Sequence, residues 1–132
     1  MTDFGPAAIL DSYLRSNWTT TPIFDGHDLD DLPNPPEPLV VVEHLAGTEV
    51  IVGCGAQIFR EDGASNFHAF VPATSGWFES DRLARELRAL LRAQEISGVQ
   101  IWETHGPQPH DKAPAGYVAS TLTATWSYDV FT

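Results

Sequence analysis

Cys54 is the single cysteine of the chain, and its thiol is the clearest candidate nucleophile. An imidazole from His44 or His68 could activate it as a base, as in thiol hydrolases. The alternative is a small buried residue within a strand, which is where a free cysteine usually lies. Gly53 and Gly55 flank the cysteine, but this segment is too short for a phosphate loop and no helix pattern follows it. We therefore favour a structural cysteine over a catalytic one.

Histidines and acids also gather in two loop-like segments, where they raise the question of metal binding. His105, His110 and Asp111 lie in a proline-rich segment, and their spacing matches no zinc pattern. The acidic segment 25–31 holds His27 among four aspartates, but the spacing does not fit the calcium loop of an EF-hand. We interpret both segments as solvated loops and expect no metal or other cofactor.

Arg85, Arg88 and Arg92 are spaced by three and four residues, so they would lie along one side of a helix. One interpretation is ordinary helix surface, in which arginines near the C-terminal end complement the helix dipole. The other is a contact with the acids of a neighbouring subunit. Exposed ion pairs contribute only about 0–1 kcal/mol, so charge alone does not decide between them. The candidate subunit-interface residues are Arg85, Arg88, Arg92, Asp28, Asp30 and Asp31.

The amino-acid composition of the chain limits the classes of function that it can have. The 132 residues predict a single domain, 1–132, with 42% hydrophobic content and four tryptophans to form a core. No apolar run approaches the roughly 20 residues that span a bilayer, and the N-terminus lacks the pattern of a secretory signal. One cysteine gives no reason to place the protein in an oxidising compartment, so a cytosolic origin is expected. Fingerprints for dinucleotides, phosphate loops, zinc proteases and serine hydrolases are missing from the sequence, and we expect a protein that is not an enzyme.

The net charge of −11 argues against binding to nucleic acid, because an acidic surface repels phosphates. Four arginines and four acids cancel between Gly76 and Glu95, so the whole excess of acids lies outside this segment. Such a surface is compatible with a soluble enzyme. It would also suit the lining of a channel through which DNA passes without binding.

The elements that would position these residues are organised around 66–94. Alternating apolar residues predict a strand to Val71, and Leu83, Leu87, Leu90 and Leu91 then form one stripe of a long helix. Around this stretch we expect a helix at 6–18, strands at 39–44, 49–59, 65–71, 99–104 and 117–131, turns at Gly47 and at 60–63, and irregular connections at 23–38 and 105–116. Gly98 is expected to end the region of the long helix.

The predicted fold class is α+β. A single amphipathic helix must cover a sheet, so we expect a mixed, mostly antiparallel sheet of about five strands with the N-terminal helix and the long central helix packed on it. The proline-rich connection at 105–116 supplies candidate loop contacts for a partner, namely His105, His110 and Lys112.

The order of these features resembles a known family. A helix leads to a Pro-Asn-Pro-Pro segment at 33–36, a strand pair, and a strand that ends in Phe-Val-Pro before a Ser-Gly and a leucine-rich helix. This resembles the tail terminator proteins of lambda-like, long non-contractile-tailed phages and related particles. The matching residues are Gly63, Phe67, Ala69, Phe70, Val71, Pro72, Ser75, Gly76, Leu83, Ala84 and Leu87. Ala73 and Thr74 depart from the glycine usual there.

The resemblance implies a structural virion protein that assembles as a homo-oligomer, a hexameric ring, at the head-proximal end of the tail after synthesis in the host cytoplasm. Such a ring caps the tail tube, stops its polymerisation and joins it to the head-tail connector protein, while DNA passes through without specific binding. Alternatives are another neck or tail component of the same particle, such as a head-completion or tail-tube protein, a small cytosolic enzyme using Cys54, and an adaptor that binds basic partners through 25–37.

Overall fold

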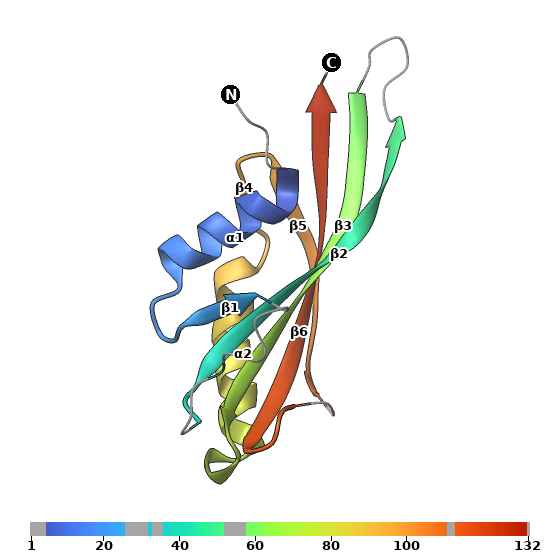
Figure 1. The fold of residues 1–132 in the computed structure, drawn as a ribbon. Coiled ribbons are helices and arrows are strands. Elements are labelled where there is room, and N and C mark those ends of the chain that lie inside the picture. The colour runs from blue at the N-terminus through green and yellow to red at the C-terminus, as the bar shows by residue number, and fades with distance from the viewer. Residues whose placement is uncertain (1–4, 26–31, 33–35, 52–57, 111–112, 132) are drawn as a thin grey trace.

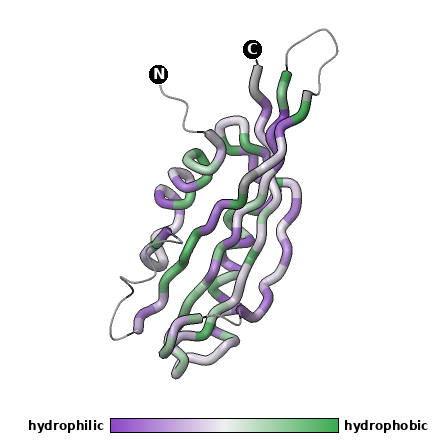
Figure 2. Tube along the Cα trace, turned by 45° about the vertical axis from the view of Figure 1, so that its right-hand side comes forward, coloured by the Kyte–Doolittle hydropathy of each residue, from purple (hydrophilic) through white to green (hydrophobic). Residues whose placement is uncertain are grey.

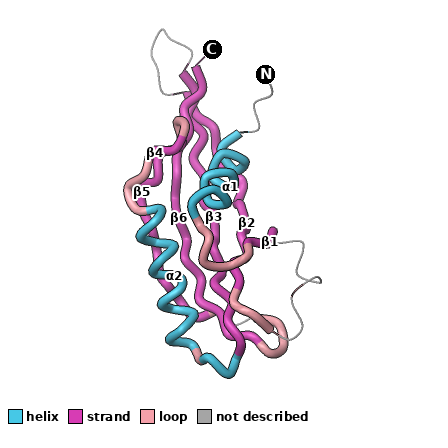
Figure 3. Tube along the Cα trace, turned by 90° about the vertical axis from the view of Figure 1, so that its left-hand side faces the viewer, coloured by secondary structure: helices cyan, strands magenta, loops and turns pink. Residues whose placement is uncertain are grey.

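The computed structural model describes residues 5–25, 32, 36–51, 58–110 and 113–131 of the chain. These residues form an α+β fold in which two helices lie against the same face of one sheet (Figure 1 and Figure 3). The elements, in chain order, are α1 (Gly5–Asn17), β1 (Ile23–Asp25), β2 (Leu39–Ile51), β3 (Ile58–Pro72), the 3-10 turn η2 (Ala73–Ser75), α2 (Trp77–Leu91), β4 (Glu95–Ile96), β5 (Val99–Pro109) and β6 (Tyr117–Phe131). Within the described ranges, no helix is long and apolar enough to cross a membrane.

The strands form one sheet in the order β1-β2-β3-β6-β5-β4. β1 runs parallel to β2, and every other neighbouring pair is antiparallel. The predicted mixed, mostly antiparallel sheet with an N-terminal and a central helix packed on it is confirmed, with six strands in place of about five. Two of the six strands, β1 and β4, were not predicted, since three and two residues are too short for a periodic pattern to reveal. The strand predicted at 49–59 is not a separate strand: its first residues belong to the end of β2 and its last residues to the start of β3.

The face of the sheet beneath the helices carries the larger hydrophobic core. Leu83, Leu87 and Leu91 of α2 are almost fully buried and pack with Leu10 and Leu14 of α1. The sheet contributes alternate residues of its central strands, namely Val40, Val42, Phe67, Ala69, Val71, Leu122, Ala124 and Trp126. The predicted leucine stripe is therefore what seats α2 on the sheet, with its fourth member, Leu90, half-buried at the margin.

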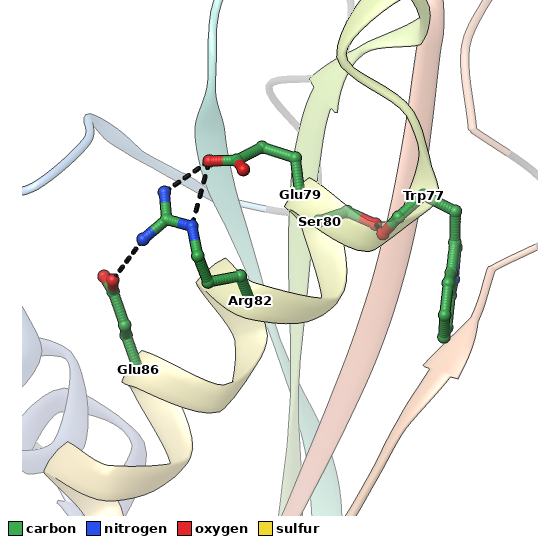
Figure 4. A network of polar contacts seen from close by, with 5 residues as sticks. All are labelled: Trp77, Glu79, Ser80, Arg82 and Glu86. Carbon is green, nitrogen blue, oxygen red and sulfur yellow. Dashed lines mark hydrogen bonds and ion pairs between the residues drawn. The ribbon is translucent and has the colours of Figure 1, made fainter.

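A polar network holds the first turn of α2 (Figure 4). Ser80 donates from Oγ to the Trp77 carbonyl oxygen at 2.7 Å, and its Oγ lies 2.8 Å from Ser120 Oγ of β6. Because the one hydroxyl proton of Ser80 is used on Trp77, Ser120 must donate to Ser80. On the exposed side, Arg82 bridges two glutamates of the same helix. The serine pair joins the helix to the sheet, whereas the exposed pairs support only the helix.

The hairpin turn predicted at Gly47 is wrong, because residues 39–51 form one continuous strand. The register between β2 and β3 shifts between Leu45 and Thr48, so Gly47 lies in a bulge. A Cβ on this glycine would lie 1.9 Å from the Asp62 carbonyl oxygen, and only glycine permits so close an approach of two strands. The glycine marks a bulge and not a reversal of the chain.

The turn predicted at 60–63 is also wrong, since these residues lie inside β3. Gly63 pairs with Trp126 of β6, and a Cβ there would come within 2.5 Å of the indole ring. The indole lies over the glycine and donates from Nε1 to Ser65 Oγ at 3.1 Å. Consequently the first half of β2 pairs with the second half of β3, and not with the strand predicted at 49–59.

Three smaller features of the secondary structure also differ from those predicted. Gly98 does not end the long helix; with Ser97 it forms the two-residue turn between β4 and β5, and φ is positive at both residues. β1 forms within 23–38, where we expected no regular element. β5 continues to Pro109, so it takes in the first part of the connection predicted at 105–116.

Beyond the bulge, β2, β3 and β6 extend past the helices as a twisted ribbon (Figure 1). We call this ribbon the arm and define it as residues 48–51, 58–62 and 127–131. Apolar residues of β3 are buried from Phe67 to Val71, whereas its first residues are at least partly exposed. Along the arm, hydrophilic colour interrupts the hydrophobic colour, which returns at the end of the arm (Figure 2).

Candidate functional site

The face of the sheet opposite the helices carries a hollow of about 530 Å³. Side chains of β2, β3 and β6 form its floor, and the end of β5 forms one wall. Its volume falls in the range of about 300–1,000 Å³ that is usual for ligand pockets. A smaller apolar cluster, centred on Leu39, Phe70 and Tyr117, lies on the same face and packs with Phe24 and Leu32. The hollow is therefore the candidate functional site.

Strand alternation and register bring the polar side chains of the floor together. Asn66 lies between Glu43 of β2 and Thr123 of β6, and His68 lies opposite Thr121. Thr123 donates to Asn66 Oδ1 at 2.6 Å, and Asn66 Nδ2 donates to Glu43 Oε1 at 3.1 Å. His68 Nδ1 and Thr121 Oγ1 are 2.8 Å apart. The chain of contacts fixes the amide and leaves the second carboxylate oxygen of Glu43 without a hydrogen bond among the described residues.

The curled end of β5 places His110 over the floor. Gly106 has a φ of 97°, and a Cβ there would meet the Thr121 carbonyl oxygen at 2.6 Å, so the strand can turn close to β6 only with glycine. The backbone nitrogen of His110 then donates to the Ala119 carbonyl oxygen at 3.0 Å. This brings the His110 ring to 4.5 Å from the ring of His68, measured between centroids. The two imidazoles form one aromatic wall.

Glu43 supplies the one carboxylate among the residues that line the hollow. Burial lowers the pKa of His68 below its usual value, and the neighbouring His110 lowers it further, so His68 is neutral near pH 7. The Glu43 carboxylate lies 3.9 Å from His68 Nε2 and is half-exposed. No arginine, lysine or protonated histidine of the described residues pairs with this carboxylate. The hollow therefore offers a carboxylate beside aromatic rings, an arrangement that suits a cation.

The two histidines considered as bases for Cys54 lie on opposite faces of the sheet. His44 lies on the helix-covered face, where its Nδ1 is 2.7 Å from Ser65 Oγ and burial lowers its pKa. His68 faces the hollow on the other side. Cys54 itself lies outside the described residues, so the thiol hypothesis stays a prediction, and the two histidines cannot share one site.

The three arginines of the predicted interface differ in their surroundings. Arg85 forms an ion pair with Asp81 at 2.9 Å on the same helix. Arg88 is half-buried and donates from Nη1 to the Gly106 carbonyl oxygen at 3.2 Å, so it holds α2 to β5. Arg92 is exposed at the end of the helix, and among the arginines in the described ranges it alone has a guanidinium group with neither a side-chain nor a backbone acceptor. Of the three arginines that were predicted to form a subunit interface, only Arg92 therefore has a guanidinium group that is not engaged within the described residues.

The remaining predicted site residues are not brought together. Asp28, Asp30, Asp31 and Lys112 lie outside the described residues. His105 is exposed on β5 and lies 3.0 Å from Glu103, whereas His110 lines the hollow. Within the described part of the chain, no group of three or more histidine, cysteine, aspartate or glutamate side chains is arranged to hold a metal ion. The predicted subunit interface stays a prediction.

Sequence reasoning missed the role of Glu43 and Asn66 and considered His68 only as a base. The polar face of β6, with Thr121 and Thr123, was visible as an alternation. Which side chains lie opposite these threonines depends on the register of β2 and β3. That register could not be predicted once turns had been placed wrongly at Gly47 and at 60–63. A search for a strand with alternate polar residues facing those threonines would have found Asn66 and His68.

Comparison with known proteins assigns no family: no family model matches the chain, and no curated protein matches it significantly.

Proposed function

We propose that the chain is a tail terminator, a ring-forming structural subunit of a phage-like tail that caps the tail tube, stops its polymerisation and joins it to the head connector. The observation that carries this proposal is a pair of different open edges on one sheet. Together they suit head-to-tail association of identical copies.

The first open edge is β2 and the second is β5. β1 pairs with β2 only at residues 40–42, and β4 pairs with β5 only at residues 99–100. In the ranges that the structure describes, no strand covers the outer side of β2 from Glu43 or of β5 from Glu103. Exposed edges invite pairing with another chain, and natural proteins usually cover or protect them. Edges this long are expected to be covered in an assembly.

Exposed apolar side chains lie on the same edges. Leu45 and Val50 of β2 are 44% and 46% exposed, and Trp102 of β5 is 61% exposed. Phe78, at the first turn of α2, is 83% exposed and packs edge-on against Trp77. Large aromatic and aliphatic side chains are typical of the centres of protein interfaces. The exposed side chains of Leu45, Val50 and Trp102 therefore support an interface at these two edges, whereas Phe78 lies apart from the edges on α2.

Two unlike edges make a heterologous interface, which closes into a ring when the rotation between neighbours is right. The resemblance described above adds the expectation of six copies. The acidic surface would let DNA pass through such a ring without binding. The arm, which extends beyond the helices, would reach a neighbouring subunit or the tube protein.

Light scattering after size exclusion, with negative-stain imaging, tests the proposal. We expect closed rings with about six times the mass of the chain, in keeping with the resemblance and with closed cyclic symmetry. Trp102→Lys and Leu45→Lys should weaken assembly, because each places a charge in the interface. Ser12→Lys, on the exposed side of α1 and away from both edges and from the predicted interface arginines, is the matched control and should assemble normally. A protein that stays monomeric at every concentration, and does not bind tube ends, would contradict the proposal.

Another neck or tail component of the same particle would share these edges. Binding to the end of the tail tube, as opposed to incorporation along its length, separates a terminator from a tube subunit.

A further inference from the structure

The two open edges of the sheet are strands that run in opposite directions. Each of the pairs β2·β3, β3·β6 and β6·β5 is antiparallel, so β5 runs antiparallel to β2. When a second copy is placed beside the first in the same orientation, its β2 meets β5 as an antiparallel neighbour. The helix layers of both copies then lie on the same side of the joined sheet. Such edges can continue a ladder of backbone hydrogen bonds from one copy to the next.

The open parts of these edges lie at different levels along the strands. The register places one row of residues across the helix-free face, from edge to edge: Glu43, Asn66, Thr123 and His105. From this row towards the arm, β5 is covered by β4 at 99–100, and in the other direction β2 is covered by β1 at 40–42. Two copies at the same level would therefore face each other, among the described residues, only at 43–45 and 103–105. Beyond these residues, β4 of one copy would occupy the place of β2 of the next.

A shift along the strands removes this conflict. If the second copy moves by about four residues in the direction opposite to its arm, or about 13 Å, its open stretch 43–51 lies along the open stretch of β5, 103–109. An even shift keeps every side chain on its own face of the sheet. The four strands from β2 to β5 span about 19 Å, so the shift corresponds to a strand tilt of about 35° against the ring axis. Closed sheets have tilts of about 35–45°, so the shift that frees the edges also suits a closed ring.

The arm, which extends past the helices in Figure 1, is the part of one copy that reaches β5 of the next. Counted through the register and its bulges, Val50 of the arm then lies opposite Glu103 and next to Trp102. The indole is held on the helix-free face by the bond from its Nε1 to Ser127 Oγ at 2.7 Å, and strand alternation places Val50 on the same face. Val50 and Trp102 are exposed in the single chain, so this pairing covers apolar surface on both edges.

We propose that neighbouring copies are joined by antiparallel pairing of β2, in the arm of one copy, with β5 of the next, shifted by about four residues from equal level. The pairing deepens the ring proposed above and rests on it. The occupant of the β5 edge is therefore a second copy of this chain. Pairing of like edges, β2 with β2, would instead close a dimer and leave both β5 edges open.

Disulfide cross-linking of the full chain tests the shift, with Cys54→Ser to remove the single native thiol. Opposite residues of antiparallel strands lie about 4.5–5.5 Å apart between Cα atoms, which is within the disulfide range of about 4.4–6.8 Å. At the proposed shift Thr48 lies opposite His105, so Thr48→Cys with His105→Cys should form covalent oligomers up to the size of the ring on mild oxidation. Glu43→Cys with His105→Cys is the matched control and should form none, since these residues face each other only at equal level. Oligomers from the control pair, or none from the test pair, overturn the shift.

The single variants separate unlike edges from like edges. Thr48→Cys alone and His105→Cys alone have no cysteine opposite them in the proposed pairing, so neither should cross-link. An equal mixture of the two should give covalent dimers and nothing larger, because each chain carries one thiol. A covalent dimer from either single variant would show that like edges pair, and the proposal would then be wrong.

The charge at position 50 gives a second measurement that needs no cysteine. Opposite Glu103, a lysine gains an ion pair and an aspartate is repelled, so Val50→Asp should need about fivefold more protein for assembly than Val50→Lys. Glu103→Lys should reverse that order. The same two substitutions at Ser12, on the exposed side of α1, should not differ from each other. Equal assembly of the two Val50 variants, or no reversal, contradicts the contact between Val50 and Glu103.

The failures of the two proposals differ. Rings of the wild type, without cross-links in Thr48→Cys with His105→Cys, leave the proposed function intact and overturn the strand pairing. Cross-linked oligomers that grow without limit support the strand pairing but contradict a closed ring. A wild type that stays monomeric and does not bind tube ends overturns both.

Discussion

The contact between Gly63 and Trp126 allows a prediction about Gly63→Ala, in which the sign of the change in the free energy of unfolding tests the packing argument. In a strand, replacing glycine by alanine normally stabilises a protein by about 0.4–1 kcal/mol, because the unfolded chain loses conformational freedom. The φ of Gly63 is not positive, so the backbone accepts alanine without strain. Without a steric conflict, Gly63→Ala should therefore stabilise the protein.

The structure predicts the opposite. The added Cβ would lie 2.5 Å from two atoms of the Trp126 ring, well inside van der Waals contact. The indole cannot move away freely, since its Nε1 donates to Ser65 and Trp126 is only 3% exposed. Overpacking of this kind costs about 1–3 kcal/mol. After the gain from the unfolded state, we expect a net loss of about 1–2 kcal/mol, or roughly 3–8 °C in Tm.

Urea denaturation followed by tryptophan fluorescence measures this loss directly. The double variant Gly63→Ala with Trp126→Leu supplies the control, because a smaller residue leaves room for the methyl group. We expect Gly63→Ala to be neutral or stabilising in the Trp126→Leu background, a coupling that a double-mutant cycle detects. If Gly63→Ala is as stable as the wild type, or costs the same in both backgrounds, the packing argument is refuted.

Three further predictions concern other contacts. Ser80→Ala should cost about 1–2 kcal/mol in chemical denaturation, because it leaves the buried Ser120 hydroxyl unpaired, and Ser80→Ala with Ser120→Ala should recover part of that loss. Because burial lowers the pKa of His68 below its usual 6.5, the unfolded chain binds more protons below that pH, so the free energy of unfolding should fall as the pH drops from 6.5 towards the folded pKa; His68→Gln should make the fall shallower. Gly47→Ala should clash with the Asp62 carbonyl oxygen and speed hydrogen exchange in the arm while the core under α2 stays protected.

The features that sequence predicts well are those with a local period. The leucine stripe of α2 and the alternation of β6 each repeat over several turns or residue pairs, so burial of one face follows directly. The helix α1 follows from its apolar spacing in the same way. Strands of two or three residues, such as β1 and β4, carry no such repeat and owe their conformation to the neighbouring strand.

The misplaced turns have a different cause. A glycine can mark a reversal, a bulge or a close approach, and its identity alone does not distinguish them. At Gly63 the deciding residue is Trp126, which is distant in sequence and adjacent only through the register of β3 and β6. The hollow depends on the same register, since Glu43, Asn66 and Thr123 come from three strands. Side chains that meet only through tertiary pairing leave no local signal.

The bulge at Gly47 also separates two regions that can change independently. The strand pairs that form the hollow lie on one side of it, and the arm lies on the other. Because side chains alternate with a period of two, adding two residues to each of β2 and β3 beyond the bulge would lengthen the arm without turning any side chain to the other face. Glu43 and Asn66 would keep their positions. The length of the arm can thus change while the body, its core and its hollow stay as they are.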